Sequence, residues 1–370
     1  MSPGITEADA KEVLKKIELE RTEPRILIKM IEQARDLGQN VMSNFEGLRN
    51  IIEDIIECLE REGILQIAKR ENKAVSELLE SPSAGVDGSY VSASEIGGTY
   101  YFPISAVTVF FRNSKDIKPQ VIFSRQTGLF QFSNWNDRAA LLEAELKDLT
   151  LETDMFAEAI ASNSKYILLD GPIVDPPNRY DMKEYKELVK QRKILLKKVL
   201  KEKKIIVGVT KQVRSRYFVK MIQDLKDLKK YKRIIGRCRD RELLSFIFTK
   251  LLYDDPDMIP YISPVEPTYP AYEEDYKNEL KILTTFTQAR VDTSPVRLEY
   301  LPPEEKMAEI LAVLVAKLTP SGREFPIQIE IAHEKCHLRL GLGESVFEEI
   351  SSHTPKDEIS MIVQSKLRGE

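Results

Sequence analysis

VDGSY (residues 86–90) and LLDGP (residues 168–172) each place an aspartate and a glycine at the end of a short apolar run. Such runs, bounded by turn residues, predict buried strands. Ligands of open α/β sheets bind at strand ends, and a glycine there lets backbone or ligand approach closely. Asp87 and Asp170 therefore predict a cation site, although an ordinary Asp-Gly turn has the same pattern.

The segments around these stretches predict an α/β fold, a mixed sheet flanked by helices. Three strands with short connections favour an antiparallel meander, and strands separated by helices favour parallel crossovers. The expected order is strands at 86–90, 100–111 and 119–124, a helix at 137–161, a strand at 166–169, a helix at 181–204 and a strand at 205–209. We then expect helix to about residue 253, a long proline-rich loop at 254–276, strands at 283–291 and 296–300, and helices at 304–318 and 329–340.

A turn cluster at residues 81–85 separates two patterns of apolar spacing and marks a domain boundary. Before it, apolar residues recur at helical spacing, which predicts a helical N-terminal arm over residues 1–80. We assign residues 81–345 to the main α/β domain and residues 346–370 to a helical C-terminal tail.

The predicted helix at 137–161 supplies a possible third acidic ligand. Glu145, Asp148 and Glu152 follow i, i+3, i+7 spacing and share one face. Glu152 borders the apolar stripe of the helix, so we expect it to point toward the sheet, beside the two aspartates. Glu145 and Asp148 are interpreted as solvated. Three converging carboxylates suit Mg²⁺ or Mn²⁺, hard ions that also bind phosphate.

The three histidines give a weaker signal than the aspartates. His333 lies on the predicted C-terminal helix with His337 one turn later, but the chain lacks the HExxH motif of zinc proteases. His353 has no motif around it. The sequence also lacks a P-loop and a GxSxG nucleophile elbow, so it indicates neither an ATPase of that type nor an α/β-hydrolase.

Charge is distributed very unevenly along the chain. Residues 179–241 hold 23 Lys and Arg against 7 Asp and Glu, a net charge of +16, whereas the whole chain carries −4. A basic stripe on an acidic protein attracts polyphosphate locally. Much of this segment also fits a solvated helix face. Lys211, Arg214 and Arg216 follow a buried strand directly, so we interpret these three as phosphate contacts.

Composition is that of an ordinary globular protein, 42% apolar and 31% charged. No apolar run approaches the ~18–20 residues that a membrane span needs. The first residues are acidic and polar, which does not fit a secretory signal. Cys58, Cys238 and Cys336 are too widely spaced for a zinc motif and odd in number for a disulfide framework. We therefore expect a cytoplasmic protein.

The motifs, taken in order, resemble the NurA family over roughly residues 80–340. The resemblance lies in VDGSY (86–90), LLDGPI (168–173), VGVTKQVRS (207–215), VRLEY (296–300) and FPIQIEIAH (325–333). NurA proteins are archaeal and bacterial nucleases of DNA end resection, a step of double-strand break repair by homologous recombination. The resemblance implies a ribonuclease-H-like fold, 5′→3′ DNA degradation with possible single-strand endonuclease activity, a homodimer, and work with the hexameric HerA ATPase.

The resemblance also implies roles for individual residues. Asp87 and Asp170 match the family's metal-binding aspartates, and His333 matches its C-terminal metal-site histidine. Glu152 fits the helix glutamate, with Glu145 as the alternative. Phe325 stands where the family often has tyrosine, which leaves base stacking but no phenol hydroxyl.

The mechanism expected from this resemblance uses two Mn²⁺ or Mg²⁺ ions. Asp87 would be the shared ligand, Asp170 and Glu152 would complete the two sets of ligands, and His333 would ligate or relay a proton. Lys211, Arg214 and Arg216 would hold the DNA backbone. Two other classes remain open: a non-catalytic nucleic-acid-binding or assembly subunit that uses the basic segment alone, and a metal phosphoesterase for small substrates.

Overall fold

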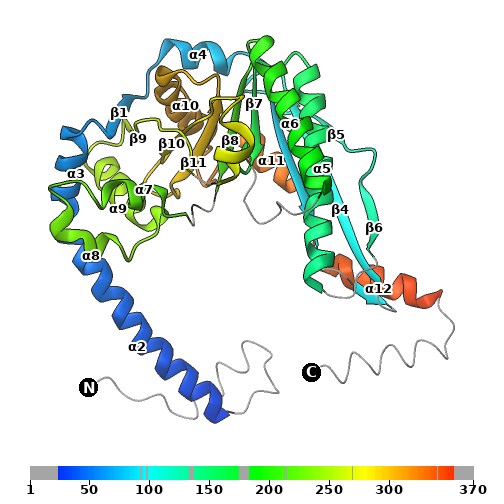
Figure 1. Cartoon of the computed structure of the whole chain (residues 1–370), viewed down its shortest axis with the longest axis horizontal. Coiled ribbons are helices and arrows are strands. Elements are labelled where there is room, and N and C mark those ends of the chain that lie inside the picture. The colour runs from blue at the N-terminus through cyan, green and yellow to red at the C-terminus, as the bar shows by residue number, and fades with distance from the viewer. Residues whose placement is uncertain are drawn as a thin grey trace.

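The computed structural model describes residues 24–91, 94–96, 99–132, 137–174, 183–211, 213, 215–268, 270–339 and 341–353. Within these residues the chain forms one mixed sheet of eleven strands with helices on both faces (Figure 1). The order along the sheet is β1-β9-β10-β11-β8-β7-β2-β4-β3, and β5 and β6 pair with β4 beyond this path. None of the helices in the described part of the chain combines the length and apolarity needed to cross a membrane.

The half of the sheet that contains the two aspartates has the predicted ribonuclease-H-like arrangement. β2 (Ser83–Tyr90) pairs antiparallel with β4 (Thr99–Phe111), which pairs antiparallel with β5 (Gln120–Phe123) and β6 (Gly128–Phe132). The crossover helix α5 (Asp137–Ala161) then leads to β7, parallel to β2, and α6 leads to β8, parallel to β7. The remaining bounds here are β3 at Ser94–Ile96, β7 at Tyr166–Asp170, α6 at Lys183–Lys201 and β8 at Ile205–Thr210.

The other half of the sheet is antiparallel. β11, β10 and β9 follow one another outward from β8, and β1 (Leu65–Lys69) closes the edge against β9. The bounds are β9 at Met258–Ile262, β10 at Leu283–Thr287 and β11 at Val296–Leu301. The predicted strand pair at 283–291 and 296–300 is thus confirmed, with the first strand shorter than expected.

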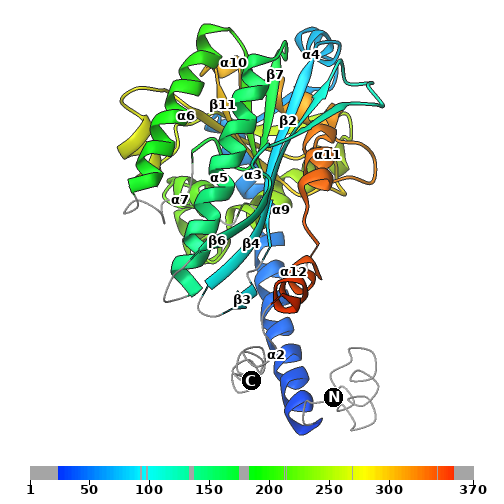
Figure 2. The same ribbon diagram turned by 90° about the vertical axis from the view of Figure 1, so that its right-hand side faces the viewer.

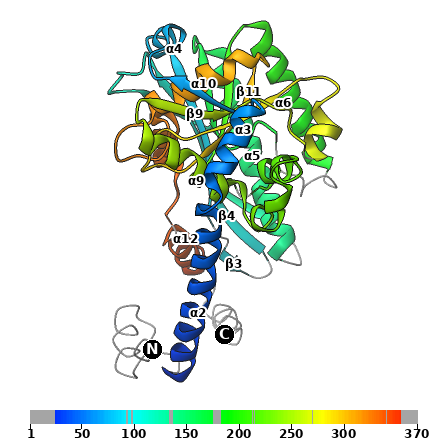
Figure 3. The ribbon, with the colours of Figure 1, turned by 90° about the vertical axis from the view of Figure 1, so that its left-hand side faces the viewer.

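Alternation of side chains along the strands divides the core between the two faces. On one face, α5 and α6 pack over β2, β4 and β7, and α3, α7 and α9 pack over β1, β9 and β10 (Figures 1 and 3). On the opposite face lie α4, α10 and α11 (Figure 2). The bounds of these helices are α3 Ile52–Arg61, α4 Lys73–Leu79, α7 Tyr217–Ile222, α9 Asp240–Asp254, α10 Glu305–Leu318 and α11 Ile327–Cys336.

The N-terminal segment is less uniformly helical than predicted. α2 (Pro24–Arg49) begins at its proline, since a proline fits the first turn of a helix, and extends away from the sheet (Figure 3). Residues 65–69, which the periodicity assigned to helix, form β1 because the neighbouring strand β9 offers a ladder of hydrogen-bonding partners. The domain limits at 80/81 and 345/346 stay predictions, and residues 1–23 lie outside the described residues.

The region 254–276 is also more ordered than the expected loop. It contains β9 and a π-helical turn, η3 (Tyr272–Tyr276), whose Tyr272 and Tyr276 are buried. Pro260 lies within β9 itself, opposite Ile67 of β1. Two short elements, η2 (Lys229–Tyr231) and α8 (Lys232–Ile235), interrupt the expected helix before α9, and α12 (Gly341–Ser352) covers the start of the predicted tail. Residues 354–370 of that tail are not described.

The contact between α11 and β2 fixes the geometry on which the site depends. Gly85, two residues before Asp87, lies so close to α11 that an added Cβ would sit 2.2 Å from the backbone oxygen of Gln328. Because α11 carries His333, the missing side chain at Gly85 sets how near that histidine comes to the strand.

We predict that Gly85→Ala destabilises the protein by about 1–3 kcal/mol, since the helix must shift to admit the methyl group. Urea unfolding measures the change. Gly128→Ala in β6 is the matched control, because no atom lies within 4 Å of its added Cβ. Equal midpoints for the two variants would contradict this packing.

Candidate metal centre

Asp87 and Asp170 lie side by side on the neighbouring strands β2 and β7. Asp170 is the last residue of β7, as predicted, and Val86 is the last residue of β2 that pairs with β7. Asp87 is not at a strand end, which corrects the prediction: β2 continues to Tyr90 because β4 still pairs with it on the other side. Asp87 therefore projects from a continuous strand at the point where β7 stops.

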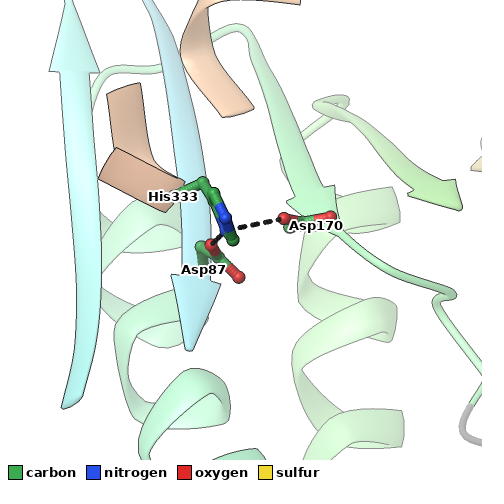
Figure 4. A group of neighbouring side chains, drawn as sticks. All are labelled: Asp87, Asp170 and His333. Atoms are coloured by element: carbon green, nitrogen blue, oxygen red, sulfur yellow. Dashed lines mark hydrogen bonds and ion pairs between the residues drawn. The ribbon is translucent and has the colours of Figure 1, made fainter. Parts of the chain in front are cut away.

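His333 reaches both aspartates from α11 (Figure 4). Its Nδ1 lies 2.9 Å from Oδ2 of Asp87 and 3.7 Å from Oδ2 of Asp170. One ligand atom from each of the three residues lies within 4.8 Å of the other two. The carboxylate of Asp87 is almost completely buried, while the imidazole is half exposed. The result is a polar cluster that is closed on the sheet side and open on the histidine side.

Burial and like charge make this cluster electrostatically strained. Burial, together with the neighbouring Asp87 carboxylate, raises the pKa of Asp170 from 3.8 to about 7, although Lys211 and His333 act in the opposite direction. The pKa of His333 is raised, chiefly by its hydrogen bond to Asp87. A bound cation would relieve the repulsion between the two carboxylates. The arrangement thus favours a positive charge between them.

Cys336 is a site residue that the sequence analysis missed. The fully buried thiol on α11 donates a hydrogen bond to Oδ2 of Asp87 at 3.2 Å, the same oxygen that faces His333. Burial raises the pKa of Cys336, so it remains a thiol and a hydrogen-bond donor. Its i, i+3 spacing from His333 was the available signal, because residues so spaced share a helix face.

Lys211 lies in the site, but with a different partner from the predicted one. Its Nζ pairs with Oδ2 of Asp170 at 2.5 Å and stands 5.0 Å from the centre of the Phe325 ring. The sequence predicted a phosphate contact. In the structure this ammonium pairs with an aspartate and Phe325 flanks it, and its contact with a phosphate stays a prediction.

Of the other two predicted phosphate contacts, the structure describes only Arg216. The guanidinium of Arg216 donates to the backbone oxygen of Gly236, at the end of α8. Arg214 lies outside the described residues. The two arginines are therefore not placed in the cluster, and their contact with a phosphate stays a prediction.

The acidic residues of α5 have contacts of their own in the structure. Glu152 is buried, and its Oε1 lies 3.9 Å from the buried guanidinium of Arg192. Glu145 accepts a hydrogen bond from Tyr90 at the end of β2. Asp148, interpreted from the sequence as solvated, packs against Gly88: an added Cβ there would lie 2.6 Å from Oδ1 of Asp148. The ligand role of Glu152 or Glu145 thus stays a prediction.

The donor set fits a divalent metal ion. Two carboxylates and an imidazole within 4.8 Å of one another offer the oxygen and nitrogen ligands that Mn²⁺ and Mg²⁺ accept. Asp87, Asp170 and His333 would hold such an ion. Asp148 packs against Gly88, the residue that follows Asp87. The raised pKa of Asp170 fits this reading, because burial and then the nearby Asp87 carboxylate disfavour its negative charge, and a cation would favour that charge.

The mixed sheet and this centre define a ribonuclease-H-like protein with a candidate metal site of two carboxylates and a histidine. Residues 83–337 match the NurA domain. The chain belongs to the NurA family. The matched residues contain all three members of the cluster.

Solved NurA structures share this fold at low sequence identity. The NurA nuclease from Sulfolobus solfataricus is 13% identical, with a TM-score of 0.58 over 90% of this chain and 97% of its own. A second NurA structure is 10% identical, with a TM-score of 0.54 over 86% of this chain and 99% of its own. A NurA bound to dAMP and manganese is 12% identical, with a TM-score of 0.51 over 87% of this chain and 99% of its own. No curated protein matches the chain.

We predict a pH dependence of stability from Asp170. Its pKa is higher in the folded than in the unfolded chain, so the folded state holds more protons between pH 3.8 and about 7. The free energy of unfolding of the metal-free protein should therefore fall as pH rises through this window. Asp170→Asn should lose this slope and melt higher than the wild type above pH about 7.

Thermal melts across pH, with and without Mn²⁺, test this expectation. Added Mn²⁺ should raise the melting temperature of the wild type but not of Asp170→Asn. The exposed Asp257 gives the matched control, Asp257→Asn, which should follow the wild type. If the melting temperatures of the wild type and of Asp170→Asn changed with pH in parallel, a raised pKa of Asp170 would be refuted.

A further prediction concerns the Cys336 thiol. Cys336→Ala removes the donor to Asp87 and should weaken Mn²⁺ binding by about 10–100-fold, the usual effect of losing a group that orients a ligand. Cys336→Ser keeps a donor and should retain most of the affinity. Isothermal titration calorimetry measures both, with Cys238→Ala as the control for loss of a buried thiol. Unchanged affinity in Cys336→Ala would exclude this role.

Proposed function

We propose that this chain is a Mn²⁺- or Mg²⁺-dependent nuclease that hydrolyses phosphodiester bonds of DNA. The observation that carries the proposal is the convergence of Asp87, Asp170 and His333 within the part of the chain that matches the NurA domain. The structural likeness to the Sulfolobus solfataricus NurA nuclease and to a NurA bound to dAMP and manganese supports it.

The site residues would divide the chemistry as follows. Asp87 and Asp170 hold the cation, and His333 ligates it or carries a proton to or from the reacting groups. A bound metal ion would supply Lewis acidity toward the phosphate and lower the pKa of a water molecule. We propose that the site binds two ions and that α5 supplies a further carboxylate ligand. Glu152 is the candidate that the family resemblance supports, and Asp148 is the acidic residue next to Gly88.

Lys211 would change partners when the metal binds. In the structure the Lys211 ammonium pairs with Asp170. A cation bound at Asp170 would repel this ammonium and leave it to pair with a phosphate. Phe325, on which the Lys211 ammonium rests, is then placed to stack on a base. We propose that Arg214 and Arg216 add charge to the same DNA path without reading sequence.

The cellular role is proposed from family membership. We infer 5′→3′ degradation, with single-strand endonuclease activity, during end resection and homologous recombination in the cytoplasm. We further propose a homodimer that works with a HerA-type hexameric ATPase. The basic segment at residues 179–241 supports contact with nucleic acid, since its charge is opposite to that of the remaining chain.

The rival function is a DNA-binding or assembly subunit without catalysis. The basic segment alone would serve such a protein. It offers no reason, however, to gather two carboxylates in a buried cluster whose charge repulsion is costly. A small-molecule phosphoesterase would use the same cluster and is distinguished by substrate.

We predict that the protein digests end-labelled DNA with Mn²⁺ and that Asp87→Asn lowers the rate by roughly a hundredfold or more, because the metal supplies several kcal/mol of stabilisation. Single- and double-stranded substrates run on a gel show rate and polarity. Asp257→Asn is the matched control, and circular dichroism checks folding.

The three functions give different outcomes. An assembly subunit binds DNA and cuts none with any ion. A small-molecule phosphoesterase turns over a phosphodiester dye and leaves DNA intact. Full activity in Asp87→Asn would show that the metal centre lies elsewhere.

A further inference from the structure

A buried ion pair on β11 takes no part in the chemistry described so far. Arg297 is 9% and Glu299 0% exposed, and Nη2 of Arg297 lies 3.2 Å from Oε1 of Glu299. Leu298 and Tyr300 of the same strand pack with α10, so alternation turns the ion pair to the opposite face of the sheet, away from the metal centre. A buried ion pair gives little net stability compared with apolar side chains of similar volume. The hydrogen bonds that this pair makes indicate a different purpose.

Glu299 holds the loop at residues 171–174, which directly follows Asp170. Its second carboxylate oxygen, Oε2, accepts the backbone N–H of Val174 at 3.1 Å. A hydrogen bond to an ionised acceptor is stronger than one between neutral groups, and no apolar side chain could replace it. The loop is therefore bonded to a fully buried carboxylate only four residues after a predicted metal ligand.

A glycine on β8 makes room for this loop beside Glu299. Gly208 is the partner of Glu299 in the pairing of β8 with β11. A Cβ added at Gly208 would lie 2.7 Å from the backbone oxygen of Gly171 and 2.7 Å from the backbone nitrogen of Ile173. From α6, the buried guanidinium of Arg192 donates to the backbone oxygen of Ile173 at 3.4 Å. The loop thus lies directly on β8 and is held by a buried charge from each of two elements.

The same ion pair also contacts the strand end that carries Lys211. Arg297 is opposite Thr210 in the β8–β11 register and donates to its hydroxyl oxygen at 3.4 Å. Lys211 is the next residue, and its ammonium pairs with Asp170. Because side chains alternate along a strand, Thr210 faces the ion pair and Lys211 faces the metal centre. Arg297 and Glu299 therefore bond, on one face, to residues next to both members of the Asp170 and Lys211 pair on the other.

We propose that Glu299, paired with Arg297, is a positioning residue for the metal centre. It sets the place of the Asp170 carboxylate through the loop at 171–174, and the place of Lys211 through Thr210, without contact with metal or DNA. The inference rests on the proposed function, because it concerns the metal-bound site. A ligand binds its metal well only when supporting residues hold it within ~0.5 Å of the binding geometry.

The test removes the acceptor of the Val174 N–H at nearly constant volume. Glu299→Leu should weaken Mn²⁺ binding by about tenfold or more, the usual effect of losing a group that orients a ligand, as measured by isothermal titration calorimetry. In the metal-free protein, the Val174 amide should exchange its hydrogen faster than in the wild type. Glu299→Gln keeps one acceptor oxygen and should lose less of both. Circular dichroism well below the melting temperature shows that each variant is folded.

A second variant and a control separate positioning from stability. Gly208→Ala displaces the same loop while Glu299 stays intact, and it should weaken Mn²⁺ binding in the same way. Thr287→Val is the control for the loss of a buried hydrogen bond, because the fully buried Thr287 donates to the backbone oxygen of Pro260 at 2.8 Å in the other half of the sheet. It should lower the melting temperature but keep the Mn²⁺ affinity and the exchange rate at Val174.

The outcomes distinguish this inference from the proposed function. Wild-type Mn²⁺ affinity in Glu299→Leu and Gly208→Ala would overturn the positioning role and leave the nuclease proposal intact. An equal loss of affinity in Thr287→Val would overturn it too, since the effect would then follow stability alone. If Glu299→Leu does not fold, Glu299→Gln and Gly208→Ala decide by the same measurements. A wild type that binds no Mn²⁺ would refute the metal centre and this inference together.

Discussion

Repulsion between the carboxylates of Asp87 and Asp170 is the interaction around which the centre is built. Two neighbouring strands bring these acids together in a mostly buried place, where burial and then the Asp87 carboxylate raise the pKa of Asp170. Three groups contact the two carboxylates: the imidazole of His333, the thiol of Cys336 and the ammonium of Lys211. Each comes from a different part of the chain than the acids, so the centre exists only when the fold is complete.

The sheet and one helix determine this geometry together. The parallel pairing of β2 and β7 ends at the level of the two aspartates, and the antiparallel partner β4 keeps β2 straight beyond that level. α11 then lies directly on β2, where Gly85 removes the side chain that would hold it away. A helix that carries His333 and Cys336 three residues apart can in this way contact a single oxygen of Asp87 with both groups.

Basic residues between 179 and 241 serve more than one purpose. Several of them are used within the protein: Arg192 lies next to Glu152, Lys193 and Lys197 pair with Glu279, and Lys204 bonds backbone oxygens at the end of α5. Lys211 faces the centre itself. The net charge of the segment therefore overstates the charge available to a polyanion, because structural pairs use part of it. Exposed lysines remain both on α6 and on the shorter elements from α7 to α8, where Lys230 pairs with Asp54 and Lys232 with Asp224.

The linear pattern of residues was enough to predict the mixed sheet, the bounds of α5, the place of Asp170 and the pairing of β10 with β11. These features depend on local periodicity and on residues that follow one another directly. Contacts between distant segments could not be predicted in this way. β1 is a strand because it pairs with β9, and Cys336 lies in the site because α11 packs on β2. Lys211, predicted as a phosphate contact, pairs with an aspartate. Glu152 is buried, as its place on the helix predicted, and it lies 3.9 Å from Arg192 of another helix, because packing and not periodicity determines which side chains a buried carboxylate meets.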